Sequence, residues 1–136
     1  QGGLIGCVKI QVRALVGIAA APDFTDWDFD AADKATLLDK GRIERPSDYG
    51  YDAMVFTHDF WTSGQDNLQL TDSVAIHCPV RLIHGQQDPD VPWEISLKLA
   101  ACLRSADVQT LLIKDGDHRL SRDQDIALLI DVVAKL

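Results

Sequence analysis

The stretch that decides the fold is Val80–Pro92, with the sequence VRLIHGQQDPDVP. Its first part, Val80–His84, is rich in branched apolar residues and is typical of a buried strand. Gly85 predicts a tight turn directly after this strand, and the loop beyond it carries Asp88, whose carboxylate we expect to be exposed. A helix over Trp93–Leu103 follows, since a proline precedes it and its apolar residues recur on one face.

A second unit of the same kind comes next. Val108–Ile113 is predicted to be a strand, and the turn Lys114–Asp117 leads from it to His118. The last helix is expected to begin at Ser121, with Gln124 completing a capping box. Its apolar residues predict one buried stripe, made of Ile126, Leu129, Ile130 and Val133. Strand, helix, strand and helix in this order indicate an α/β fold with a parallel pair of strands.

Asp88 and His118 each follow the end of a strand. The carboxyl ends of parallel strands share one edge of a sheet, where ligands bind, so we expect the two side chains to meet there. An acid after one strand and a histidine after the next is the second half of a Ser…Asp…His order. Asp88 would hold the imidazole in one tautomer, and His118 would act as general base and then general acid. The alternatives are a turn aspartate and a surface histidine.

The first half of the chain differs in texture. Ala14–Ala21 is a continuous apolar run that fits a strand buried on both faces. Asp23–Asp72 is acidic, holds all but one of the aromatic residues, and is predicted to be a lid-like insertion. Within it we expect a helix over Asp33–Lys40 and a turn over Ser63–Asn67, while Asp52–Trp61 fits either a strand or a helix. Five of its aromatic residues form either an acyl pocket or the core of the insertion itself: Trp27, Phe29, Phe56, Phe60 and Trp61.

Composition excludes several classes of protein. The 136 residues suffice for one domain, and 46% hydrophobic with 25% charged residues is ordinary for a globular protein. A net charge of −8 argues against a nucleic-acid partner and against an anionic membrane surface. No apolar run is long enough for a membrane span, and the start QGGLIGCVKI has neither an initiator Met nor a basic leader. We expect a cytoplasmic protein.

Neither a metal nor a cofactor is predicted. Three widely spaced cysteines, Cys7, Cys78 and Cys102, form no CxxC motif and favour a reducing compartment over a disulfide framework. An acidic run starting at Asp26 begins like a calcium loop but lacks the later glycine and glutamate. His77, Cys78 and His84 are possible metal ligands, but His84 lies in or at the end of a predicted buried strand and the spacing matches no standard zinc site. Glycine-rich phosphate loops are absent from the sequence.

Three segments carry a resemblance to a known family. CPVRLIHGQQDPDVPW and KDGDHRLSR resemble the end of an α/β-hydrolase, and ALVGIAAAPDFT, Ala14–Thr25, resembles the strand after its nucleophile helix. The match is to the abhydrolase group, which includes bacterial esterases and palmitoyl-protein thioesterase-like serine hydrolases. The resemblance implies a partial α/β-hydrolase fold over residues 1–136, with 23–72 as the insertion. It also implies that Asp88 is the triad acid and His118 the triad base.

The nucleophile of that family is missing from the sequence. No G-x-S-x-G motif occurs, and no serine lies at a strand-to-helix elbow followed by Gly. Gln1–Gly2–Gly3 resembles the end of a G-x-S-x-G-G elbow, so the resemblance makes the backbone N–H of Gln1 an oxyanion-hole donor. We therefore predict the C-terminal fragment of a serine hydrolase acting on small-molecule carboxylic esters or acyl thioesters. The alternative is a non-catalytic pseudo-hydrolase, or a truncated gene product that acts at most as a binding module.

Overall fold

The chain forms two compact units in the computed structural model, which describes residues 12–47 and 50–136. The first unit holds residues 75–136 together with the described part of the first twenty residues, and the second is Ala21–Val74. The bounds of this second unit are close to those of the predicted insertion, residues 23–72. Its role as a lid stays a prediction, and the segment Gln1–Gly3, which resembles the end of an elbow, lies outside the described residues.

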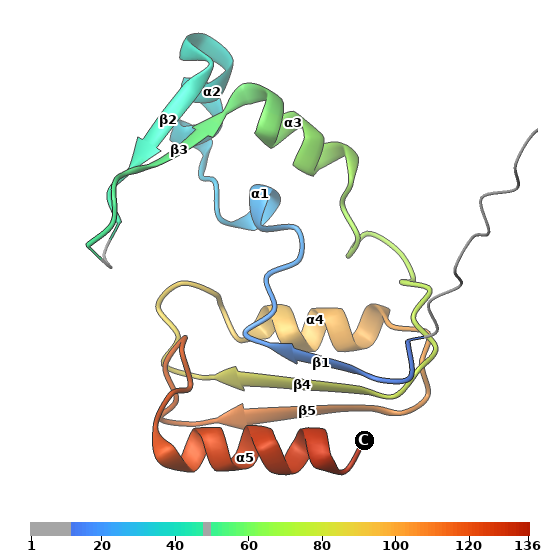
Figure 1. The fold of residues 1–136 in the computed structure, drawn as a ribbon. Helices are drawn as coiled ribbons and strands as arrows, with labels where there is room; N and C mark the ends of the chain where they lie inside the picture. Colours follow the sequence, from blue (N-terminus) through green and yellow to red (C-terminus); the bar gives the residue numbers. More distant parts are fainter. Residues whose placement is uncertain (1–11, 48–49) are drawn as a thin grey trace, which may run out of the picture. The chain divides into compact units, whose positions relative to one another are not determined.

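A parallel three-stranded sheet forms the centre of the first unit. Its order is β1 (Leu15–Ile18), β4 (Val80–Gly85) and β5 (Val108–Ile113), so β4 pairs on both sides. Figure 1 shows the three strands pointing the same way, and the loops that follow β4 and β5 leave from the same end of the sheet. The α/β architecture with parallel strands predicted from the sequence is confirmed.

Two helices complete the first unit. α4 (Glu94–Cys102) connects β4 with β5 and contacts both strands, and α5 (Asp123–Ala134) follows β5. The central strand has the deepest burial, because Val80, Leu82 and Ile83 are fully covered by the strands and helices around them. A strand that is enclosed on both faces has a nearly continuous apolar sequence, and this pattern is what predicts β4 from the sequence.

Three details of this unit differ from the sequence-based expectations. β1 is half as long as the predicted strand and its last residue, Ile18, is 46% exposed. α5 begins at Asp123, and its capping carboxylate comes from Asp125, which accepts the backbone N–H of Arg122, so the predicted Ser121 cap is wrong. The predicted buried stripe of α5 is also wrong, since its members Ile126, Ile130 and Val133 are exposed.

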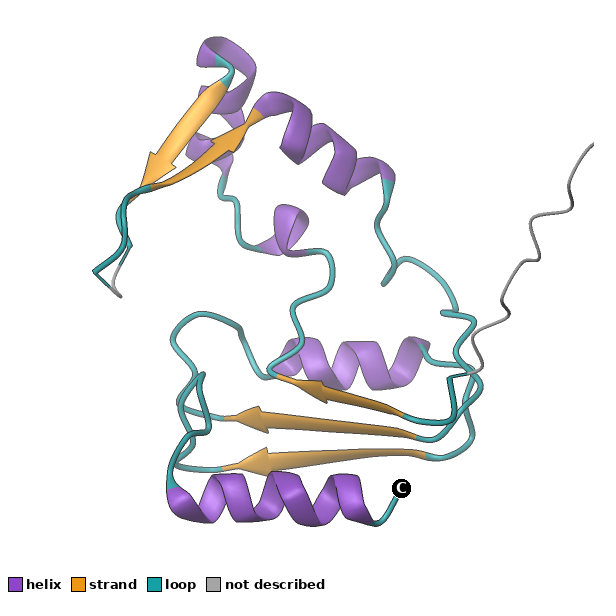
Figure 2. Ribbon diagram, viewed as in Figure 1, coloured by secondary structure: helices purple, strands orange, loops and turns teal. Residues whose placement is uncertain are grey.

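The second unit consists of short helices and an antiparallel β-hairpin. In order it contains α1 (Phe24–Trp27), α2 (Ala31–Lys40), the antiparallel pair β2 (Arg42–Arg45) and β3 (Met54–Thr57), and α3 (His58–Asp66). Figure 2 shows these strands and helices by colour. The ambiguous segment 52–61 is both strand and helix, because the Thr57 hydroxyl accepts the N–H of Phe60 and starts a helix where β3 ends.

The aromatic residues of this unit form its core. Phe29, Leu37 and Ile43 are buried together, with Phe24, Phe56 and Trp61 packed against them. The Phe29 and Phe56 rings meet edge to face with centroids 5.2 Å apart, a favourable aromatic geometry. Of the two readings left open for the aromatic residues, the structure therefore supports a core, with Phe60 remaining 46% exposed.

The turn predicted at Ser63–Asn67 is wrong, because most of that segment belongs to α3. Gly64 lies inside the helix at its contact with α1. A Cβ on Gly64 would lie 2.5 Å from Cγ2 of Thr25 and closer still to its hydroxyl, so only glycine allows the helices this approach. A tertiary contact, and no turn, explains this glycine. No helix among the described residues is long and apolar enough to cross a membrane.

Candidate active site

The loops after β4 and β5 are joined through their backbones. Gln86 N–H donates to the carbonyl of Ile113 at 2.8 Å, and Gln87 N–H donates to the carbonyl of Gly116 at 2.9 Å. A Cβ on Gly85 would lie 2.5 Å from the carbonyl oxygen of Asp117 and closer still to the carbonyl group of Gly116. Two adjoining strands can deliver their loops at this separation only because Gly85 has no side chain.

Asp88 and His118 meet at this end of the sheet. Nδ1 of His118 lies 2.9 Å from Oδ2 of Asp88, across 30 residues of sequence. The Asp88 side chain is 1% exposed and the His118 side chain 36% exposed. The contact predicted from the strand order is therefore present, but the expectation of an exposed carboxylate at Asp88 is wrong.

The Asp88 carboxylate is buried because its loop closes around it. Oδ1 accepts the backbone N–H groups of Asp90 at 2.8 Å and Val91 at 3.0 Å. Burial alone would raise the pKa of Asp88, but the N–H of Val91, the hydrogen bond from His118 and the N–H of Asp90 together outweigh it. The net effect lowers the pKa of Asp88 below its ordinary value. The carboxylate is thus held in its charged form beside the imidazole.

His118 is positioned by a loop with its own internal bonds. Oδ1 of Asp117 accepts the backbone N–H of Leu120 at 2.9 Å, and Leu120 is buried with a positive φ of 44°. Arg122 then spans the loop, with forked hydrogen bonds to Asp115 and to Asp125. The hydrogen bonds that Arg122 donates to Asp125 and Asp115 raise the pKa of Arg122 and lower the pKa of both carboxyl groups, so this ion cluster stays charged on both sides.

The ring of His118 has one bonded and one open nitrogen. Its Nδ1 contacts the carboxylate and is therefore assigned as the protonated nitrogen. Within the part of the chain that the structure describes, Nε2 has no hydrogen-bond partner. A partly exposed imidazole with a lone pair on Nε2 and a buried carboxylate behind Nδ1 can take a proton from a hydroxyl or thiol and later return it.

The sequence reasoning missed two residues of this site. His84, the residue before Gly85 in β4, is fully buried and its Nε2 lies 3.2 Å from Oδ2 of Asp88. Ser96 in α4 is 1% exposed, and its hydroxyl lies 2.7 Å from Nδ1 of His84. A histidine inside an apolar strand four residues before the acid was the available signal, because a buried imidazole requires polar partners.

One group of side chains has the composition of a metal site. Ligand atoms of Asp88, Asp90 and His118 lie within 4.8 Å of one another. Both oxygens of Asp88 already accept hydrogen bonds, from two backbone N–H groups and two imidazoles. An ion would have to displace these donors, so the geometry fits an acid–base pair better than a metal centre. The predicted oxyanion donor, Gln1, lies outside the described residues.

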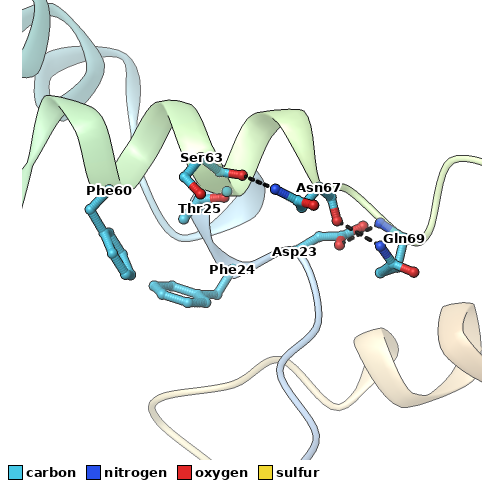
Figure 3. Close-up of a pocket in the computed structure, with 8 residues that line it drawn as sticks. Asp23, Phe24, Thr25, Phe60, Ser63, Asn67 and Gln69 are labelled. Atoms are coloured by element: carbon cyan, nitrogen blue, oxygen red, sulfur yellow. Dashed lines mark hydrogen bonds between the residues drawn. The ribbon is translucent and has the colours of Figure 1, made fainter. Parts of the chain in front are cut away.

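The second unit contains a hollow of about 320 Å³, drawn in Figure 3. Polar groups of its lining hydrogen-bond to the chain itself. The Asp23 carboxylate accepts the N–H groups of Gln69 and Leu70, and the amide of Asn67 donates to the Ser63 carbonyl. Phe24 and Phe60, with ring centroids 5.9 Å apart, supply the apolar side. The hollow thus offers apolar surface beside polar groups that are already hydrogen-bonded.

Comparison with known proteins identifies relatives that match most of this chain. It is 36% identical over 134 residues to a mouse palmitoyl-protein thioesterase, ABHD10, and 32% identical to its human counterpart, both mitochondrial. The alignment covers 93% of this chain and 45% and 44% of those relatives, so the chain spans less than half their length. No family model matches the sequence.

Two solved structures share the fold. A protein from Agrobacterium vitis S4 described as a hydrolase superimposes with a TM-score of 0.83 at 36% identity, over 92% of this chain and 49% of that one. Mouse α/β-hydrolase domain-containing protein 10 superimposes with a TM-score of 0.79 at 34% identity, over 90% of this chain and half of that one. The similarity therefore includes both units of the chain.

Proposed function

We propose that this chain, which has the sequence and fold of the C-terminal part of an α/β-hydrolase, supplies the catalytic acid and base of a serine hydrolase. The observation that supports the proposal most is the 2.9 Å contact between Nδ1 of His118 and Oδ2 of Asp88 at the carboxyl end of a parallel sheet. The substrates would be carboxylic esters or acyl thioesters, because the relatives include palmitoyl-protein thioesterases.

In this reaction His118 has two successive roles. Its Nε2 accepts the proton of a serine hydroxyl as that oxygen attacks the acyl carbon, and it returns the proton to the leaving alcohol or thiol. Asp88 keeps Nδ1 protonated and stabilises the imidazolium formed in between. The same pair then activates water to release the acid. The backbone N–H of Gln1 would stabilise the oxyanion in both halves of the reaction.

The nucleophile has to come from outside these 136 residues. The chain has six serines, and none lies in a G-x-S-x-G elbow: Ser47, Ser63, Ser73, Ser96, Ser105 and Ser121. Among them Ser96 is linked to the site through its hydrogen bond to His84, but its hydroxyl is buried and bonded to that ring. The proposal therefore places a serine elbow directly before Gln1 in the coding sequence.

The test begins with the coding sequence upstream of Gln1 and continues with the protein made from the whole open reading frame. We expect a G-x-S motif there and labelling of its serine by a fluorophosphonate probe. His118→Ala should reduce turnover of an acyl thioester by about 10⁴- to 10⁶-fold, since triad members act as a unit. His77→Ala, a change at an exposed histidine, is the matched control.

Two results would overturn the proposal. One is an open reading frame without a serine elbow, and the other is a folded His118→Ala protein that is labelled and turns over like the parent. The first result would favour the second candidate, a non-catalytic binding module, for which the missing elbow is the supporting observation.

The predicted cytoplasmic location stays a prediction, and neither Cys78 nor Cys102 takes part in a disulfide within the described residues.

A further inference from the structure

His84 is held on all sides in the interior of the first unit. The ring is fully buried, so each of its nitrogens requires a partner. Nε2 lies 3.0 Å from the carbonyl oxygen of Val91 and 3.2 Å from Oδ2 of Asp88. Nδ1 lies 2.7 Å from the hydroxyl of Ser96. Every polar atom of the ring is therefore bonded.

These partners decide the tautomer of the neutral ring. The Val91 carbonyl and the Asp88 carboxylate only accept hydrogen bonds, so Nε2 of His84 carries the proton and is shared between them. Nδ1 is then an acceptor, and the Ser96 hydroxyl must donate to it. The hydroxyl is shielded from water, because Ser96 is 1% exposed in the first turn of α4.

We propose that Ser96 and His84 form a relay of positioning residues that fixes the catalytic carboxylate for His118. The relay runs from the Ser96 hydroxyl to Nδ1 of His84, and from Nε2–H of His84 to Oδ2 of Asp88, the oxygen that His118 also contacts. It rests on the proposed function, since it assigns these residues to the acid of that triad. Neither residue touches substrate or takes part in proton transfer.

The geometry explains why a second imidazole is useful here. Backbone N–H groups from the loop hold Oδ1 of Asp88, but they leave Oδ2 with only the partly exposed His118. The N–H of the buried His84 ring donates a second hydrogen bond to Oδ2, so the carboxylate cannot rotate when His118 moves. α4 and β4 are thereby coupled to the site through one hydroxyl and one ring.

The kinetic experiment uses the protein made from the whole open reading frame. His84→Phe, which keeps a ring but removes the donor, is expected to lower kcat about tenfold to a hundredfold with KM unchanged, the range for one charge-assisted hydrogen bond. His84→Gln, whose amide N–H can replace Nε2–H, should recover most of that loss. Ser96→Ala should lower kcat by a smaller factor, and Ser105→Ala, a turn serine away from the site, is the control.

Coupling separates a relay from two independent structural defects. In a relay, Ser96→Ala has its effect through the ring nitrogens of His84, so it should cost almost nothing further in the His84→Phe background, which lacks them. Additive losses in the double variant would overturn the proposal, as would a rise in KM that accounts for the loss. A variant that fails to fold is recognised by circular dichroism, and Ser96→Ala, the mildest change, then carries the test.

A spectroscopic measurement on this chain keeps the relay testable if the protein proves not to be a hydrolase. The chain has four histidines, so ring nitrogen resonances can be assigned with single variants. We expect His84 to be protonated at Nε2 and unprotonated at Nδ1, and Ser96→Ala to shift the low-field proton between His118 and Asp88. The opposite tautomer, or an unmoved proton resonance, would overturn the relay irrespective of turnover.

Discussion

Gly85→Ala tests whether the two loops of the site are joined as closely as the structure shows. The added methyl group would lie 2.5 Å from the carbonyl oxygen of Asp117 and closer to the carbonyl group of Gly116. These are backbone atoms of the loop that carries His118, so relief requires the whole loop to move. We expect a large loss of stability in the first unit and separation of His118 from Asp88.

The size of this loss of stability follows from the contacts that the added methyl group would disturb. Overpacking by one methyl group usually costs about 1–3 kcal/mol. A displaced loop would also strain the two backbone hydrogen bonds that Gln86 and Gln87 donate across the junction, each worth about 1 kcal/mol. The sum is about 3–5 kcal/mol, a large part of the about 5–15 kcal/mol that stabilises a typical domain.

Amide hydrogen exchange of β4 and β5 measures this loss, because those amides report on the first unit alone. Gly17→Ala is the matched control, since Gly17 is also a strand glycine but faces the end of a flexible side chain, Cδ2 of Leu82, at 2.9 Å. Because only the end of the Leu82 side chain has to shift, that cost should stay near the lower limit for overpacking, about 1 kcal/mol. Equal exchange free energies for the two variants would refute the close approach of the loops.

Three further outcomes are expected. Leu37→Ala should remove about 2–5 kcal/mol from the second unit in urea unfolding, because Leu37 is fully buried, while Leu38→Ala at an exposed site should be nearly neutral. Asp88 has a lowered folded pKa, so its stabilising effect is present above the unfolded pKa and is lost as pH falls through the folded one. Asp88→Asn should therefore flatten the stability–pH curve below about pH 4. Arg122→Leu should destabilise the chain at neutral pH and less at acid pH, where Asp125 becomes protonated, as thermal unfolding across pH would show.

The pairing of Asp88 with His118 could be predicted because parallel topology determines where loops emerge. Each residue follows a strand that is readable from an apolar run, and successive parallel strands end at one edge of a sheet. The burial of Asp88 could not be predicted in the same way. It depends on backbone N–H groups of Asp90 and Val91 turning inward, which follows from loop conformation and has no signature in periodicity.

The second unit shows where local propensity loses to tertiary contacts. Gly64 and its polar neighbours are typical of a turn, yet they form helix because α3 packs on Thr25. Trp61 Nε1 and Gln65 Nε2 both bond to Thr25, which fixes the same contact from two further helical positions. A contact between residues 36 to 40 positions apart in sequence outweighs a propensity of about 1 kcal/mol for a single glycine.

Two apolar patterns that both predict burial have opposite outcomes in β4 and α5, and neighbouring elements account for the difference. β4 pairs with a strand on each side and touches α4, so its apolar residues are enclosed. The apolar residues of α5 recur with regular helical spacing, but Ile130 remains 65% exposed. Periodicity reports which face of an element is apolar, whereas burial needs a second surface to cover it. Predicted core positions are therefore secure where the topology itself supplies both neighbours, as it does for the strand that leads into Asp88.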